Sequence, residues 1–147
     1  MVEYNREMRS SIALRINRTR VQAEEGPQRW FANVYDAREM PTASYPARTV
    51  QNVRDCDGTI WFGTIDTPGA KTTLDACKRF KKPMMLATPS DVVLASDVVA
   101  WLRRNPQIER LNIAGNCASK NPGIGERVER FLIAVFKRIE TGHTADI

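Results

Sequence analysis

A loop at residues 63–73, with the sequence GTIDTPGAKTT, holds residue types that suit an anionic ligand. It follows a short apolar run and opens a helical pattern, so unpaired backbone N–H groups at the helix start would face a bound phosphate. Gly69 permits close approach of the backbone, while Lys71 and Thr72 add a cation and a hydroxyl group. The spacing of a P-loop is absent because Ala70 separates Gly69 from Lys71. The pattern fits an anion site and a plain strand-to-helix connection equally well.

A second loop at residues 115–126, GNCASKNPGIGE, also follows an apolar run and opens a helix. It carries Lys120 shortly before Pro122 and Gly123, and its glycines do not have the GxGxxG spacing of a dinucleotide fingerprint. Two such loops at the carboxyl ends of parallel strands favour a shared cleft for an anionic ligand.

Carboxylates near the first loop raise the question of acid–base chemistry. Asp55 and Asp57 precede the apolar run and Asp66 lies within the loop, so we expect all three near the ligand edge. Paired carboxylates can act as general acid and base, which makes Asp57 and Asp66 weak catalytic candidates. Asp57-Gly58 also has the composition of an ordinary turn before a strand. We therefore favour ligand binding over turnover.

Cysteine and histidine offer little for metal or nucleophile chemistry. Cys56, Cys77 and Cys117 form an odd, widely spaced set without a CxxC pair, which argues against a disulfide framework or a zinc site. Cys77 falls on an apolar helical face and fits the core, whereas Cys56 and Cys117 are expected near the ligand edge. The sole histidine, His143, lies in a polar tail, so no His-based triad or metal site is expected.

Apolar runs without alternation predict strands buried on both faces. They lie at residues 60–62, 84–86 and 111–114, and a helical pattern follows each of them. The expected helix boundaries are a cap at Thr42 or Ser44 with Pro46 in the first turn, a helix over residues 70–80, a cap at Ser96 with an end at Asn105-Pro106, and a last helix running to about Ile139. The order predicts a Rossmann-like, doubly wound, mostly parallel α/β sheet.

The first 34 residues do not follow this pattern. Ile12, Leu14 and Ile16 alternate with polar or small residues, which is typical of a half-buried strand, and residues 30–35 form a second apolar run after a turn. A β-hairpin is the preferred interpretation, and an amphipathic helix through Met8, Ile12 and Ile16 is the alternative. We expect one domain, with an atypical segment at 1–34, a Rossmann-like core at 35–140 and a flexible tail at 141–147.

The composition of the 147 residues is that of a soluble globular protein, with 42% hydrophobic and 27% charged residues. No apolar stretch approaches the roughly 20 residues that span a bilayer, and the first residues lack a secretory signal, so a cytoplasmic location is expected. The net charge is +5. Its basic residues are spread along the chain and favour helix C-termini over a nucleic-acid patch, so a nucleic-acid partner is possible but not favoured.

Three stretches, YPARTVQNVRDCDGTIWFG, TPGAKTTLDACKRFKKP and LNIAGNCASKNPGI, resemble the molybdenum-cofactor carrier protein family. That family belongs to a wider Rossmann-like group with nucleotide-binding and cytokinin-activating relatives. The resemblance implies a cytoplasmic homo-oligomer that binds a molybdopterin-type or nucleotide-like phosphorylated ligand. By position, the residues that match its motifs are Arg48, Thr49, Asn52, Thr67, Gly69, Lys71, Thr72, Gly115, Asn116, Pro122 and Gly123, beside which the loop cation Lys120 stands.

The chain departs from that family at its start. Family members begin with a strand and a Gly-Gly-Gln-Thr-Gly type loop, and nothing in residues 1–33 resembles it. Either the hairpin-like segment replaces this unit or a neighbouring subunit completes the pocket. The leading hypothesis is a carrier or sensor that binds a phosphorylated, nucleotide-like ligand. The alternatives are a nucleotide hydrolase or glycosyl-transfer enzyme using Asp57 or Asp66, and a nucleic-acid-binding or assembly module using the basic N-terminal segment.

Overall fold

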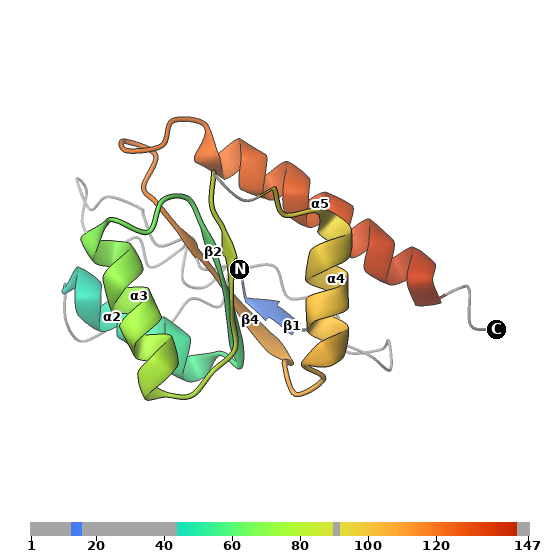
Figure 1. The fold of residues 1–147 in the computed structure, drawn as a ribbon, viewed down its shortest axis with the longest axis horizontal. Helices are drawn as coiled ribbons and strands as arrows, with labels where there is room; N and C mark the ends of the chain where they lie inside the picture. The colour runs from blue at the N-terminus through green and yellow to red at the C-terminus, as the bar shows by residue number, and fades with distance from the viewer. Residues whose placement is uncertain (1–12, 16–43, 90–91, 144–147) are drawn as a thin grey trace, which may run out of the picture.

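The computed structural model describes residues 13–15, 44–89 and 92–143. Within these residues a four-stranded parallel sheet has the strand order β1-β4-β2-β3 (Figure 1). The strands are β1 (Ala13–Arg15), β2 (Gly58–Phe62), β3 (Met84–Ala87) and β4 (Arg110–Gly115). The helices are α2 (Tyr45–Asp55), α3 (Pro68–Arg79), α4 (Ala95–Arg104) and α5 (Ile124–His143). The predicted Rossmann-like α/β fold is confirmed.

Strand β2 is the centre of the core, and all five of its residues are buried. Ile60 and Phe62 belong to the apolar cluster that includes residues of α4 and α5. Thr59 and Trp61 project to the opposite face, because successive side chains of a strand alternate. There the side-chain amide of Asn112 donates to the Thr59 hydroxyl at 3.4 Å. The prediction of a strand buried on both faces is therefore confirmed.

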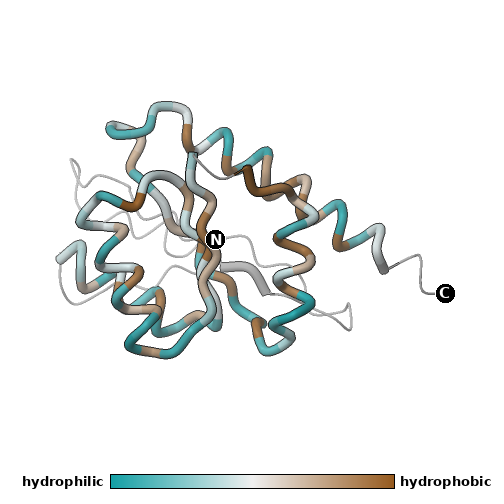
Figure 2. Tube along the Cα trace, in the orientation of Figure 1, coloured by the Kyte–Doolittle hydropathy of each residue, from teal (hydrophilic) through white to brown (hydrophobic). Residues whose placement is uncertain are grey.

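Helices cover both faces of the sheet (Figure 1). α4 and α5 pack on one face around Val98, Leu102 and Val135, whereas α2 and α3 pack together on the other around Val53 and Cys77. In Figure 2, hydrophobic and hydrophilic residues alternate along the described helices, as expected of helices with one buried face. None of the described helices is long and apolar enough to cross a membrane.

Three of the predicted helices have boundaries that differ from the structure. Helix α3 begins at Pro68, after the Thr67 cap, rather than at Ala70. Helix α4 begins after Leu94 rather than at a Ser96 cap, because the carboxylate of Asp97 accepts a hydrogen bond from the Leu94 N–H at 2.8 Å. A carboxylate within the first turn thus satisfies the helix start without a hydroxyl cap. Helix α5 continues past Ile139 to His143. Ser44 caps α2 as predicted, with Pro46 in the first turn.

The predicted position of Asp55, Cys56 and Asp57 near the ligand edge is wrong. These residues precede β2, so they lie at the amino end of the strand, opposite the Gly63 loop. The Asp57 carboxylate accepts hydrogen bonds from the backbone N–H groups of Glu109 at 3.2 Å and Arg110 at 2.8 Å. Asp57 therefore ties the start of β4 to the start of β2, which is a structural role.

Strand β1 accounts for part of the N-terminal prediction. It pairs in parallel with β4, with Leu14 opposite Leu111, so residues 13–15 form a strand and not the alternative amphipathic helix. The second half of the predicted hairpin, at residues 30–35, lies outside the described residues, as does the end of the tail at 144–147.

The Asp57 contacts predict a loss of stability on substitution. Asp57→Ala leaves two backbone N–H groups without their charged acceptor, so we expect the free energy of unfolding to fall by about 1.5–3 kcal/mol. Urea denaturation of both proteins measures the change. Asp55→Ala is the control, because that exposed carboxylate accepts a hydrogen bond from the Gln51 side chain of its own helix, and its loss should cost about 0.5 kcal/mol or less.

The buried thiol of Cys77 predicts a pH dependence of stability. Burial raises the pKa of Cys77 above its usual value of 9.0, although a hydrogen bond with Thr59 and the charge of Lys82 lower it in part. The unfolded chain loses this proton at a lower pH than the folded chain does. The stability that the neutral Cys77 thiol contributes to the fold is therefore complete below pH 9.0, and it is lost as the pH rises toward the pKa of the folded state. Urea midpoints should fall more steeply above pH 9.0 in the wild type than in Cys77→Ala; equal slopes would contradict this.

Candidate functional site

The N-termini of α2 and α3 lie together at the carboxyl edge of the sheet. Both helices run from this edge toward the amino ends of the strands, and Val50 and Val53 of α2 pack with Ala76 and Cys77 of α3. The loop between β4 and α5 leaves the sheet at the same edge (Figure 1). The structure thus brings together the three segments that carry the predicted binding residues.

The side chain of Asn116 joins the loops that follow β2 and β4. Its oxygen accepts from the Thr64 N–H at 2.7 Å, and its amide nitrogen donates to the Thr64 carbonyl at 3.3 Å and the Thr67 hydroxyl at 3.5 Å. Asn116 N also donates to the Phe62 carbonyl at 3.0 Å. Asn116 therefore holds one loop against the other, and its side chain is largely used within the protein.

The hydroxyl groups of the predicted site also have partners within the protein. Thr67 caps α3 by accepting from the Ala70 N–H at 3.2 Å. Thr72 donates to the Pro68 carbonyl at 2.9 Å, and Thr49 donates to the Tyr45 carbonyl at 3.2 Å. Each of these bonds is local to its helix start, so the hydroxyl groups stabilise the α2 and α3 N-termini.

Glycines allow the close approach of the two strands and the turns beyond them. A Cβ atom on Gly115 would lie 2.6 Å from the Phe62 carbonyl oxygen, so no larger residue fits between β2 and β4. Gly63 and Gly123 adopt φ angles of +112° and +73°, which favour glycine. Gly69 differs, since a Cβ atom there would meet only Trp61 at 3.8 Å. Gly69 is therefore not required by the packing of the described residues.

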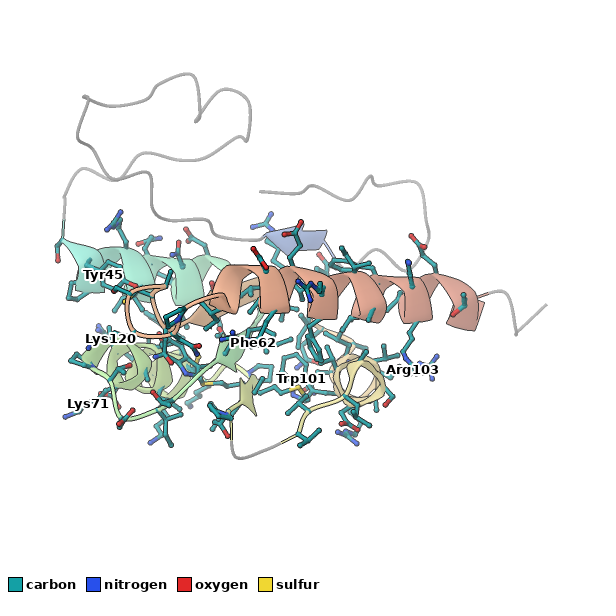
Figure 3. The ribbon with its side chains drawn as sticks, turned by 90° about the horizontal axis from the view of Figure 1, so that it is seen from above. Tyr45, Phe62, Lys71, Trp101, Arg103 and Lys120 are labelled. Atoms are coloured by element: carbon teal, nitrogen blue, oxygen red, sulfur yellow. The ribbon has the colours of Figure 1, made fainter. Side chains whose placement is uncertain are left out.

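Cations surround this set of loops. Figure 3 shows Tyr45, Lys71 and Lys120 at one end of the molecule, from α2, α3 and the β4–α5 loop respectively. Lys71 and Lys120 are exposed, whereas Arg48 is half-buried with its guanidinium carbon 5.4 Å from the centre of the Tyr45 ring. The Nε atom of Arg48 is buried and has no hydrogen-bond partner among the described residues. Asn52 lies one turn further along α2 and is half-buried.

The two carboxylates considered for catalysis lie far apart in the fold. Asp66 is exposed in the loop at the carboxyl edge, as predicted, whereas Asp57 lies at the amino end of the same strand. The structure does not bring them together as an acid–base pair. Within residues 13–15, 44–89 and 92–143, no group of three or more His, Cys, Asp and Glu side chains could hold a metal ion.

A mostly apolar pocket on the α4–α5 face was not predicted. Its volume is about 510 Å³, within the range of small-molecule sites. Its lining residues come from the ends of β2 and β3 and from the start of α5, and include Phe62, Gly63, Thr88, Asn121, Ile124 and Phe131. Phe62 and Phe131 meet edge to face with ring centres 5.6 Å apart. The available signal was that Phe62-Gly63 and Ala87-Thr88 leave two parallel strands at the same edge.

The chain belongs to the circularly permutated YpsA SLOG family, which matches residues 16–136. This match includes much of the N-terminal segment that the strand pattern did not explain. Among solved structures, the chain is similar to a "Putative molybdenum carrier protein" from Syntrophus aciditrophicus SB, with 30% sequence identity and a TM-score of 0.62. The similarity covers 69% of this chain and 66% of that protein, so the chain spans just under two thirds of its length. No curated protein matches the chain.

These comparisons confirm the family resemblance that the three motifs indicated. They also support a ligand-binding role in general terms. The ligand itself is a separate question.

Gly63 and Gly125 form a matched pair for testing the loop geometry. A Cβ atom on Gly63 would lie 2.0 Å from the Asn116 side-chain oxygen at a φ of +112°, whereas a Cβ atom on Gly125 meets nothing within 4 Å. We expect Gly63→Ala to lower the free energy of unfolding by about 2 kcal/mol or more. Gly125→Ala in helix α5 should raise it by about 0.5–1 kcal/mol. Urea denaturation measures both, and similar effects of the two substitutions would contradict the geometry.

Proposed function

We propose that this protein binds a phosphorylated ligand of the nucleotide or molybdopterin type, as a carrier or sensor, at the carboxyl edge of its sheet. The observation that carries the proposal is that Arg48, Lys71 and Lys120 lie at the starts of α2 and α3 and in the β4–α5 loop, three segments that meet at one edge of the sheet. None of the three lies within 4.0 Å of a carboxylate among the described residues. The name of the similar molybdenum carrier protein supports the choice of ligand class.

Side-chain cations, more than backbone N–H groups, would bind the phosphate in this arrangement. Thr67 accepts from the N–H groups of Ala70 and Lys71, and Pro68 has no N–H. In the first turn of α3, these bonds therefore leave the backbone N–H of Gly69 available to a ligand. Helix α2 begins in the same way, with Ser44 accepting from Ala47 and Arg48. The charge for anion binding thus comes mainly from lysine and arginine, supported by the helix dipoles.

Arg48 is the residue best placed to orient a ligand. Its Nε atom is buried without a partner among the described residues, and an unpaired buried donor is costly unless an acceptor reaches it. A phosphate or carboxylate oxygen would supply that acceptor in a bidentate geometry. Contact with the Tyr45 ring limits the conformations of the guanidinium group. The remaining site residues would act by holding the loops in place.

The proposal includes a homo-oligomer in the cytoplasm, as the family resemblance implies. A neighbouring subunit would then complete the wall that a Gly-Gly-Gln-Thr-Gly loop forms in the carrier proteins. Native mass spectrometry of freshly purified protein would report the subunit number and any co-purified ligand together.

Removing two cations from the site predicts a loss of ligand affinity. We expect Lys71→Ala/Lys120→Ala to weaken binding of AMP, GTP or a pterin phosphate by about 10-fold or more, because charge-assisted contacts to phosphate are lost. Isothermal titration calorimetry measures the dissociation constants.

The matched control is Lys137→Ala/Arg138→Ala, which removes the same charge from exposed positions near the C-terminal end of α5. This control should bind the same probes with nearly wild-type affinity. Equal losses in the two variants, or no binding of any probe by the wild type, would contradict the proposal.

A further inference from the structure

Positive charge gathers at the amino edge of the sheet, opposite the proposed ligand site. This surface, here called the basic edge, includes the ends of α2, α3 and α4 and the start of β4. Its exposed cations are Arg54, Lys78, Arg79, Lys81, Arg103, Arg104 and Arg110. With Lys82, the basic edge holds eight lysines and arginines and three carboxylates. The rest of residues 44–89 and 92–143 holds seven lysines and arginines and six carboxylates. Most of the excess charge of these residues is therefore on one side of the molecule.

The cations of the basic edge are available to a partner. None of the seven exposed side chains lies within 4.0 Å of a carboxylate among the described residues. Two of the three carboxylates are already used, since Asp57 accepts from the backbone at Glu109 and Arg110 and Asp55 accepts from Gln51. Local pairing between side chains thus does little to offset the positive potential of this surface.

The backbone fixes one cation of this surface, Lys82, in position. Lys82 donates through its amine to the carbonyl groups of Arg54 and Cys56, and so links the end of α2 to the turn after α3. Lys81 in that turn has a φ of +53°, a conformation in which glycine is favoured at the end of a helix. Lysine thus occupies a turn position at which the backbone conformation favours glycine.

We propose that the basic edge binds the phosphate backbone of nucleic acid without reading its sequence. Lysine and arginine spaced along one surface are the electrostatic footprint of such binding. A membrane is the less suitable polyanion, because the exposed large hydrophobic residues of the described chain lie elsewhere, at Tyr45, Ile65, Val92, Leu94 and Ile133. The basic edge therefore lacks apolar anchors and fits a fully polar, highly charged partner.

The test compares two variants with the same change in net charge. Lys78→Gln/Arg103→Gln/Arg104→Gln removes three cations from the basic edge, and Arg130→Gln/Lys137→Gln/Arg138→Gln removes three exposed cations from α5. Fluorescence anisotropy of a labelled, mixed-sequence DNA duplex is measured for both variants and the wild type across about 50 to 200 mM salt. Circular dichroism melting confirms that all three proteins are folded.

We expect the wild type to bind the duplex with an affinity that falls steeply with salt. The basic-edge variant should lose about 10-fold or more in affinity at low salt, and the slope of log K against log salt should decrease by about 2 to 3, as for three lost phosphate contacts. The α5 variant should stay within about 3-fold of the wild type.

Three outcomes would overturn the proposal. They are no binding by the wild type at low salt, equal losses in the two variants, and binding to polyglutamate or anionic vesicles as tight as binding to the duplex. Because the basic edge and the ligand site use different residues, AMP or pterin phosphate binding should not change in the basic-edge variant. The two proposals therefore stand or fall separately.

Discussion

The parallel direction of the strands is the constraint on which the other features depend. Because β2, β3 and β4 point the same way, each helix that connects them must run back across the sheet. Helices α2, α3 and α4, which lead into these strands, therefore begin at the carboxyl edge and end at the amino edge. The positive ends of the helix dipoles meet at one edge, where anions are stabilised, and the negative ends meet at the other, where cations are favoured. One topological rule thus separates the candidate ligand site from the basic edge.

The close contact between β2 and β4 turns that rule into a defined site. Phe62 and Gly115 pair at the ends of their strands, and the backbones lie so close there that Gly115 has no room for a side chain. Asn116 follows directly and bonds to Thr64 and Thr67 across the gap. The α3 N-terminus and the β4–α5 loop are consequently fixed relative to each other, and such preorganisation would lower the entropy cost of binding at the proposed site.

The sequence predicts the core elements well because their signals are local. Buried runs such as Ile60–Phe62 and the apolar stripe of α5 identify strands and helices without knowledge of their neighbours. The errors arise where a contact decides the outcome. Ser96 has the right residue type for a cap, but the Asp97 carboxylate satisfies the helix start from within. Asp57 adjoins β2, as predicted, but at the amino end of that strand and not at the carboxyl end. Its hydrogen-bond partners are more than fifty residues away in sequence.

The same distinction explains which parts of the site and of the surface were missed. The pocket at Phe62 and Phe131 combines residues from several separate segments, so the sequence indicates only the two strand ends that contribute to it and not the pocket as a whole. The cations of the basic edge are dispersed in the sequence and meet only because three helices end at one edge. Conversely, Thr67 and Asn116 look like ligand groups in the sequence, yet in the fold they bond to the protein itself.

This internal use of hydroxyl and amide groups limits what the ligand site can recognise. A site whose polar neutral groups are already paired has few hydrogen-bonding groups left with which to distinguish one heterocycle from another. The other polar groups of this cluster are the Asn52 amide and the cations Arg48, Lys71 and Lys120, and the cations recognise charge rather than ring structure. Under the proposed function, selectivity for a particular nucleotide or pterin would therefore depend on groups beyond these cations. In the proposed homo-oligomer, an adjoining subunit would be one source of such groups.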